Sequence, residues 1–210
     1  MRRWRCLAGF MVAGSMVCGC SLTSPRPDLT KYYVLTAVAA PATPPITSRL
    51  PVIGLGPVTL PGYLDHNEIV TRAGPNQLDL SNDDRWAEPV DQNFKNVLAR
   101  DLGEFIGTDQ IVQFPWYGGA KLDYKVELNV SRFDADESGM ATLNAKWIIR
   151  AGGSDRVLLA RETNLTQPAG STSTGAEVGA LSQNLGGLSQ AIAAAIIQLQ
   201  AQNPQVSMGN

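Results

Sequence analysis

Histidine and cysteine are nearly absent from this chain of 210 residues. His66 is its single histidine, which excludes zinc and iron sites built from several histidines unless carboxylates alone hold the metal. The three cysteines stand at positions 6, 18 and 20, so nothing beyond residue 20 can form a disulfide or act as a thiol nucleophile. The Gly-x-Ser-x-Gly turn of serine hydrolases and the three-glycine dinucleotide loop are also missing. We therefore expect no catalytic residues, no metal and no cofactor, in a protein that is not an enzyme.

Positive charge is scarce as well. Of the 17 lysines and arginines, Arg2, Arg3 and Arg5 lie at the very start of the chain, which leaves 14 basic against 19 acidic residues and a net charge of −5. A surface of this sign is repelled by phosphate groups. Nucleic acid and anionic membrane surfaces are therefore not expected as direct partners.

Long hydrophobic runs are missing too, and the longest candidate has the form of a secretory signal. The three arginines precede an apolar stretch, residues 7–17, which glycines interrupt and which is shorter than the ~20 residues of a membrane span. Val17-Cys18-Gly19-Cys20 then resembles a bacterial lipobox. The pattern predicts a signal peptide over residues 1–19, with cleavage before Cys20, rather than the alternative of an uncleaved transmembrane anchor.

Cleavage makes Cys20 the lipidation site, and its acyl chains form a stable membrane anchor because each buried methylene contributes ~0.8 kcal/mol. Ser21, in place of an aspartate, favours the outer membrane with the protein facing the periplasm. Residues 20–30 are polar, contain Pro25 and Pro27, and predict an acylated tether of at most roughly 35 Å. A single domain over residues 31–203 and a polar tail over 204–210 complete the predicted organisation.

Strand-like composition marks most of the predicted domain. Short strands are expected at residues 31–36, 52–56, 68–72 and 77–80, with Pro57 and Pro61-Gly62 ending the second. Three longer segments follow, 122–133, 140–151 and 156–166, in which apolar and polar residues alternate. They predict an antiparallel meander with one buried face.

Two helices are predicted from apolar residues spaced by three and four. The first opens at Pro89 and presents an apolar face from Val90 to Phe105. The second follows a capping box formed by Thr174 and Glu177 and reaches residue 199. The expected fold class is α+β: an antiparallel-rich mixed sheet packed against two main helices. The last helix is either a core helix or presents a second face to another subunit or partner, which leaves a homo-oligomer open.

Four segments together resemble one family. They are Tyr32–Leu35, Val52–Asp65, Ile69–Arg72 and Arg85–Pro89, in this order behind the lipobox. Through them the chain is similar to the auxiliary lipoproteins of lipid-transporting ABC systems, the PqiC family. The resemblance implies an α/β sandwich on an outer-membrane lipoprotein that docks MCE-domain tunnel proteins, which carry phospholipid between the two membranes, and that supports envelope integrity.

The predicted partner interface comprises Tyr63, Leu64, Arg85 and Trp86. The first two belong to a segment broken by Pro61 and Gly62, where an exposed aromatic is suited to anchor a partner. The alternative is that both side chains fold back over the sheet. Trp86 equally suits the start of the first helix, and Arg85 a local ion pair with Glu88. A rival function is a periplasm-facing carrier that holds a lipid between sheet and helices, which would require a large apolar cavity.

Replacing the lipidation site tests the anchor. Cys20→Ala should yield a soluble or an unprocessed protein, because the thiol that receives the acyl chains is gone. Cell fractionation with an alkaline wash measures this. A fully processed Cys20→Ala protein that still resists the wash in the membrane fraction would show that another segment holds the protein there.

Overall fold

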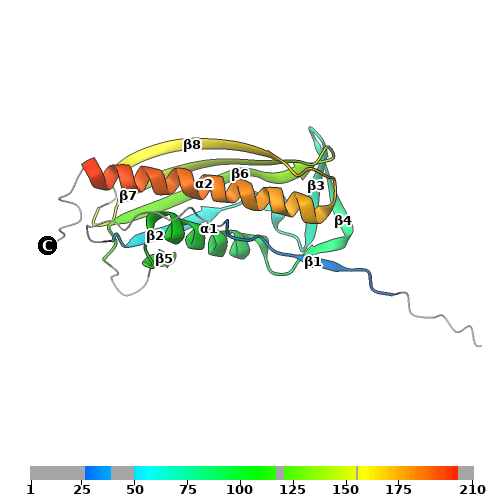
Figure 1. Cartoon of the computed structure of the whole chain (residues 1–210), viewed down its shortest axis with the longest axis horizontal. Coiled ribbons are helices and arrows are strands. Elements are labelled where there is room, and N and C mark those ends of the chain that lie inside the picture. Colours follow the sequence, from blue (N-terminus) through cyan, green and yellow to red (C-terminus); the bar gives the residue numbers. More distant parts are fainter. Residues whose placement is uncertain (1–26, 39–49, 117–120, 155, 203–210) are drawn as a thin grey trace, which may run out of the picture.

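The computed structural model describes residues 27–38, 50–116, 121–154 and 156–202; Cys20, the signal peptide and most of the predicted tether lie outside them. The domain is a single α+β unit in which two helices cover one face of an eight-stranded mixed sheet (Figure 1). Neither helix within the described ranges is long and apolar enough to cross a membrane. The elements are β1 (Lys31–Tyr33), β2 (Ile53–Thr59), the 3-10 helix η1 (Gly62–Leu64), β3 (Glu68–Gly74), β4 (Gln77–Trp86), α1 (Val90–Ile106), β5 (Ile111–Gln113), β6 (Tyr124–Asp136), β7 (Met140–Ala151), β8 (Val157–Pro168) and α2 (Thr174–Gln202).

Strand β6 is the centre of the sheet. One of its edges pairs antiparallel with β7, which pairs antiparallel with β8, so the predicted meander is confirmed. Its other edge pairs in parallel with two strands in turn: with β2 over residues 124–129 and with β3 at residues 135–136. Beyond them, β5 extends the sheet from β2, while β4 and β1 extend it from β3. The predicted fold class is therefore confirmed.

Several strands run further than the sequence predicts, among them β2 and β4. β2 continues through Pro57 to Thr59, because the register against β6 shifts between Leu55 and Val58 and accommodates the proline in a bulge. β4 continues past Leu80 to Trp86, although residues 81–84 are polar. Its last three residues pair with β1, and this contact with a distant segment supplies what the local composition lacks.

The buried face of α1 agrees with the prediction except at its end, where Ile106 is fully buried and Phe105 only partly. The start of α2 differs more. The Thr174 hydroxyl donates to Asp84 Oδ2 at 2.6 Å, and the Glu177 N–H donates to the Ser173 carbonyl at 3.0 Å. Thr174 is thus the first helical residue and bonds to β4, so the predicted capping box is wrong.

Helix α2 is a core helix. It contacts β6, β7 and β8 on one side and α1 on another (Figure 1). The segment after β1 covers it further: the N–H groups of Leu35, Thr36 and Val38 donate to Asn93 Oδ1 (2.6 Å), Ser182 Oγ (3.2 Å) and Asp101 Oδ1 (3.0 Å). Side chains of both helices thereby satisfy backbone groups that no strand pairs. Burial raises the pKa of Asp101 to about 6.

A glycine of α2 makes room for this segment. A Cβ placed on Gly186 would lie 2.5 Å from Val38 Cγ2, whereas one placed on Gly179, in the same helix, would meet nothing within 4 Å. The helix-weakening glycine at position 186 is therefore a packing requirement.

The two glycines predict opposite effects of the same substitution. Gly179→Ala should raise the free energy of unfolding by about 0.5–1 kcal/mol through helix propensity. Gly186→Ala should lower it by about 1–3 kcal/mol, because the new methyl group displaces Val38. Urea unfolding of both variants measures this. Equal stabilisation by the two substitutions would mean that residues 34–38 do not pack on α2.

Candidate functional site

The structure separates the four predicted interface residues into two kinds. Leu64 and Trp86 are core residues, 5% and 6% exposed, whereas Tyr63 and Arg85 are partly exposed. The burial of Leu64 agrees with the alternative prediction, in which its side chain folds back over the sheet. Arg85 pairs with Glu68 across β3 and β4 at 3.2 Å rather than with Glu88. Glu88 instead accepts a hydrogen bond from Asn93 at 2.6 Å.

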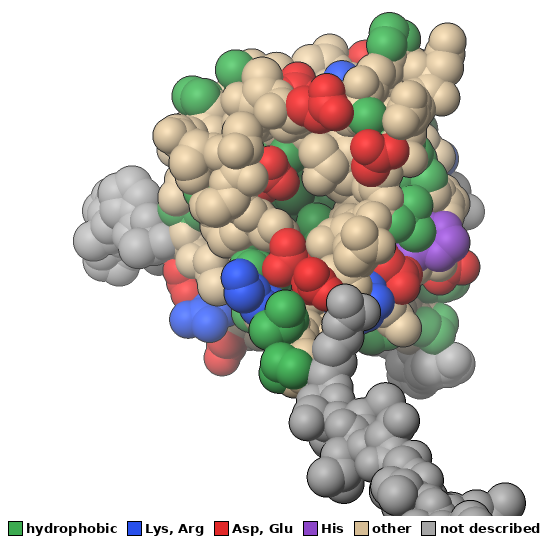
Figure 2. All heavy atoms as spheres, turned by 90° about the vertical axis from the view of Figure 1, so that its right-hand side faces the viewer, with side chains coloured by type: hydrophobic (Ala, Val, Ile, Leu, Met, Phe, Trp, Pro, Cys, Tyr) green, Lys and Arg blue, Asp and Glu red, His purple; other side chains and the backbone are tan. Residues whose placement is uncertain are grey.

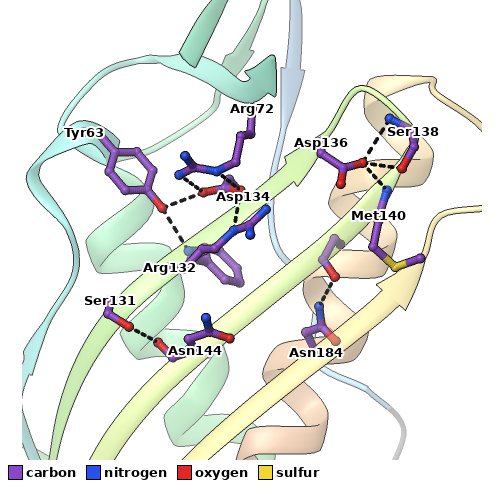
Figure 3. A network of polar contacts seen from close by, with 12 residues as sticks. Tyr63, Arg72, Ser131, Arg132, Asp134, Asp136, Ser138, Met140, Asn144 and Asn184 are labelled. Carbon is purple, nitrogen blue, oxygen red and sulfur yellow. Dashed lines mark hydrogen bonds and ion pairs between the residues drawn. The ribbon is translucent and has the colours of Figure 1, made fainter. Parts of the chain in front are cut away.

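Tyr63 belongs to a buried polar network around Asp134, whose side chain is inaccessible to solvent (Figure 3). The Tyr63 hydroxyl donates to Asp134 Oδ2 at 2.7 Å. Arg72 donates to both carboxylate oxygens, at 3.1 and 2.9 Å, and Arg132 Nε donates to Oδ1 at 2.9 Å. The Arg72 guanidinium also lies 5.8 Å from the centre of the Tyr63 ring. Two cations and a hydroxyl thus compensate the buried charge.

The network fills a gap in the sheet. Between the stretch of β6 that pairs with β2 and the stretch that pairs with β3, the Phe133 N–H has no strand partner on that edge and donates to the Tyr63 hydroxyl at 3.1 Å. Burial raises the pKa of Tyr63 to about 12, so the hydroxyl stays protonated and both accepts and donates. Tyr63 is therefore part of the fold as well as of the surface loop.

The residues that complete this network escaped sequence analysis. The predicted strand ends at residue 133, just before Asp134, but β6 continues to Asp136. The turn itself is held by Asp136 Oδ1, which accepts hydrogen bonds from Ser138 and Met140 (Figure 3). The hairpin is as predicted. The ranges that the structure describes contain no group of three or more His, Cys, Asp or Glu side chains able to hold a metal ion.

The loop that carries Tyr63 also borders a surface cleft of about 650 Å³. We call it the loop cleft; it lies between residues 58–68 and the start of α1. Apolar Val58 and Leu60 share its lining with charged Asp65, Glu68 and Asp91. His66 lines it as well and is exposed to solvent. Such a mixed lining suits a protein segment with both apolar and polar groups.

Removing one hydroxyl tests the network. Tyr63→Phe should lower the free energy of unfolding by about 1–3 kcal/mol, because the Phe133 N–H and the Asp134 carboxylate each lose a buried partner. Tyr32→Phe is the control, since that side chain is 66% exposed and should change stability by less than about 0.5 kcal/mol. If Tyr63→Phe unfolds like the unmodified protein in thermal melts, the hydroxyl does not hold the sheet together.

Known proteins share this architecture. The chain is 23% identical over 154 residues to the intermembrane transport lipoprotein PqiC of Escherichia coli (strain K12), an alignment that covers 73% of this chain and 76% of that protein. The crystal structure of protein XCC0632 from Xanthomonas campestris superposes with a TM-score of 0.70 at 20% identity, covering 84% of this chain and 99% of the other, which shows a shared fold.

A family-wide comparison covers nearly all of the domain. Residues 33–193, from the end of β1 to the last turns of α2, match the family described as ABC-type transport auxiliary lipoprotein component. The matched range includes the loop cleft and the whole Asp134 network. This chain belongs to the family of ABC-type transport auxiliary lipoproteins.

Proposed function

We propose that the protein is a non-catalytic outer-membrane lipoprotein, acylated on Cys20, that docks an MCE-domain tunnel protein of a phospholipid transport system and supports envelope integrity. The match of residues 33–193 to the auxiliary lipoproteins of ABC-type transport carries this proposal. The lipobox and Ser21 support the outer membrane, facing the periplasm. The similarity to an intermembrane transport lipoprotein supports a role between two membranes.

The packing between sheet and helices favours an interaction subunit over the rival lipid carrier. Large apolar side chains fill this layer, and each of them is less than 2% exposed; they include Phe94, Phe133, Trp147, Leu185 and Leu188. A carrier needs an apolar cavity of several hundred Å³ in this position. The loop cleft lies instead at the surface beside a loop, with charged residues in its lining.

We assign the loop cleft to the protein partner. Its loop is held in place by the bonds of Tyr63 to β6, so little conformational entropy is lost when a partner binds. The core residue Leu64 is part of its lining, and Trp86 donates a hydrogen bond to Asn67, which also lines it. Tyr63 and Arg85 are partly exposed, and Arg85 pairs with Glu68 of the lining. Of the predicted interface residues, Leu64 and Trp86 thus support the loop, and Tyr63 and Arg85 offer accessible surface to the partner.

The loop cleft also lies at the end of the domain nearest the anchor. The Trp86 N–H donates to the Asn67 carbonyl at 2.7 Å, and Trp86 pairs with Tyr33 in β1, a few residues after the predicted tether. A tunnel that extends to the outer membrane would bring its outer end close to this end of the domain. The position of the loop cleft therefore fits the proposed partner.

A pair of glycines permits a matched test of the loop cleft. Gly62 lines it and Gly153 lies in the turn between β7 and β8; a Cβ at either position meets nothing within 4 Å, and neither residue has a positive φ. Gly62→Arg should weaken capture of the MCE-domain partner tenfold or more, equivalent to about 1.4 kcal/mol, while Gly153→Arg leaves it unchanged. Crosslinking in envelopes with mass spectrometry identifies the partner, and binding to the purified partner gives the ratio.

Both variants should melt within a few degrees of the unmodified protein, since a Cβ at either position meets no atom within 4 Å and leaves the longer side chain a path to solvent. Equal binding by the two variants would exclude the loop cleft as the docking surface. Recovery of no MCE-domain protein from crosslinked envelopes would contradict the proposed partner itself.

A further inference from the structure

Three large apolar side chains are exposed where the described chain begins. Leu29 is 65% exposed, Tyr32 66% and Val34 44%. We call them the apolar strip. Figure 2, which faces this end of the domain, shows hydrophobic side chains beside the point where the described residues begin. Isolated exposed leucines are common on protein surfaces, but three within six residues form a local apolar surface.

The backbone that carries the apolar strip is held in place. Tyr32 and Val34 alternate with Tyr33 and Leu35, whose side chains turn inward: the Tyr33 hydroxyl donates to Asp84 at 3.1 Å, and Leu35 is 3% exposed. Strand pairing with β4 fixes residues 31–33, and the bond from Leu35 to Asn93 fixes the segment after them. The outward direction of Tyr32 and Val34 is therefore set by the fold.

The tether limits how far this surface can be from the membrane. Pro27, the first described residue, lies seven residues after Cys20. Seven residues span at most about 25 Å when fully extended. An acylated Cys20 therefore keeps Leu29 and Tyr32 within a short distance of the bilayer, whichever way the domain turns.

We propose that the apolar strip rests in the headgroup region of the bilayer that holds the acyl chains, and that it fixes which end of the domain faces the membrane. Tyrosine suits this boundary, because its ring is apolar and its hydroxyl is polar. The net charge of −5 argues against electrostatic attraction, so the contact depends on apolar area and should persist on neutral lipids. The inference rests on the anchor of the proposed function and requires no protein partner.

Two valines provide a matched test. Val34 in the apolar strip and Val157 are 44% and 46% exposed. Val34 directly follows β1 and Val157 begins β8, and β1 lies at the opposite end of the domain from the start of β8 (Figure 1). Cys6 and Cys18 leave with the signal peptide and the thiol of Cys20 carries an acyl chain, so Val34→Cys and Val157→Cys each introduce the one reactive thiol of the mature lipoprotein. Both variants are labelled with an environment-sensitive fluorophore.

The labelled lipoproteins are reconstituted in vesicles of phosphatidylethanolamine and phosphatidylcholine that contain a spin-labelled quencher lipid. We expect a blue shift and at least threefold stronger quenching at position 34 than at position 157. Adding Tyr32→Asp to the Val34→Cys variant should reduce the quenching at position 34, because an aspartate beside the label disfavours the headgroup boundary.

Three outcomes would overturn the inference. Equal quenching at the two positions means that the domain has no preferred orientation. A blue shift at position 34 that grows with protein density, without lipid quenching, means that a second copy of the chain covers the apolar strip. No quenching at position 34, in a protein that floats with vesicles, excludes the contact while leaving the anchor intact. Acylation is verified by mass spectrometry, and loss of flotation in an acylated protein would instead contradict the anchor of the proposed function.

Discussion

The sheet depends on the buried carboxylate of Asp134 at the point where the pairing of β6 with β2 ends and its pairing with β3 begins. One edge of β6 pairs first with β2 and then with β3, and a strand edge divided in this way leaves backbone groups unpaired between the two. Tyr63 satisfies the Phe133 N–H there, and Asp134 fixes the tyrosine while it compensates Arg72 and Arg132. Removal of one member leaves a buried charge or N–H without its partner, which costs more than the bond itself contributed.

The same contact connects the fold to the surface proposed for the partner. The connection between β2 and β3 contains the short helix η1, in which the carbonyls of Pro61 and Gly62 accept two backbone hydrogen bonds from within the connection. The hydroxyl of Tyr63 bonds Asp134 of β6, 71 residues away in the chain, and holds the loop against the sheet beside the loop cleft. The structural and the surface interpretations of Tyr63 are therefore not exclusive, since its side chain holds a loop in which Gly62 and residues 65–67 are exposed.

The sequence predicts well what repeats locally and poorly what depends on distant segments. Alternation identifies β6 and β7 because each buries one face, and the spacing of Phe94, Leu98 and Leu102 identifies α1. The end of β4 is missed because residues 81–84 are polar, and the strand continues there through the pairing of residues 84–86 with β1 and of Arg85 with Glu68 in β3. Thr174 has the pattern of a cap, yet its hydroxyl bonds Asp84, 90 residues earlier in the chain. In the candidate site, Pro61 and Gly62 identify the loop that carries Tyr63. Nothing in the sequence around Arg72 or Asp134 indicates that these two side chains meet Tyr63.

The first folded segment joins the predicted anchor to every layer of the domain. β1 pairs with β4, and Asp84 in β4 accepts hydrogen bonds from Tyr33 and from Thr174 at the start of α2; the bond from Thr174 lowers the pKa of Asp84 and keeps it ionised. A few residues later the chain is bonded to α1 and α2. A pull on the tether therefore acts on the sheet and both helices together, and the domain should move as one body on its anchor. Because the apolar strip and the loop cleft both lie close to β1, any preferred orientation on the bilayer also sets the direction in which the loop cleft faces. Membrane contact and partner capture are then coupled by geometry, without any change of conformation in the domain.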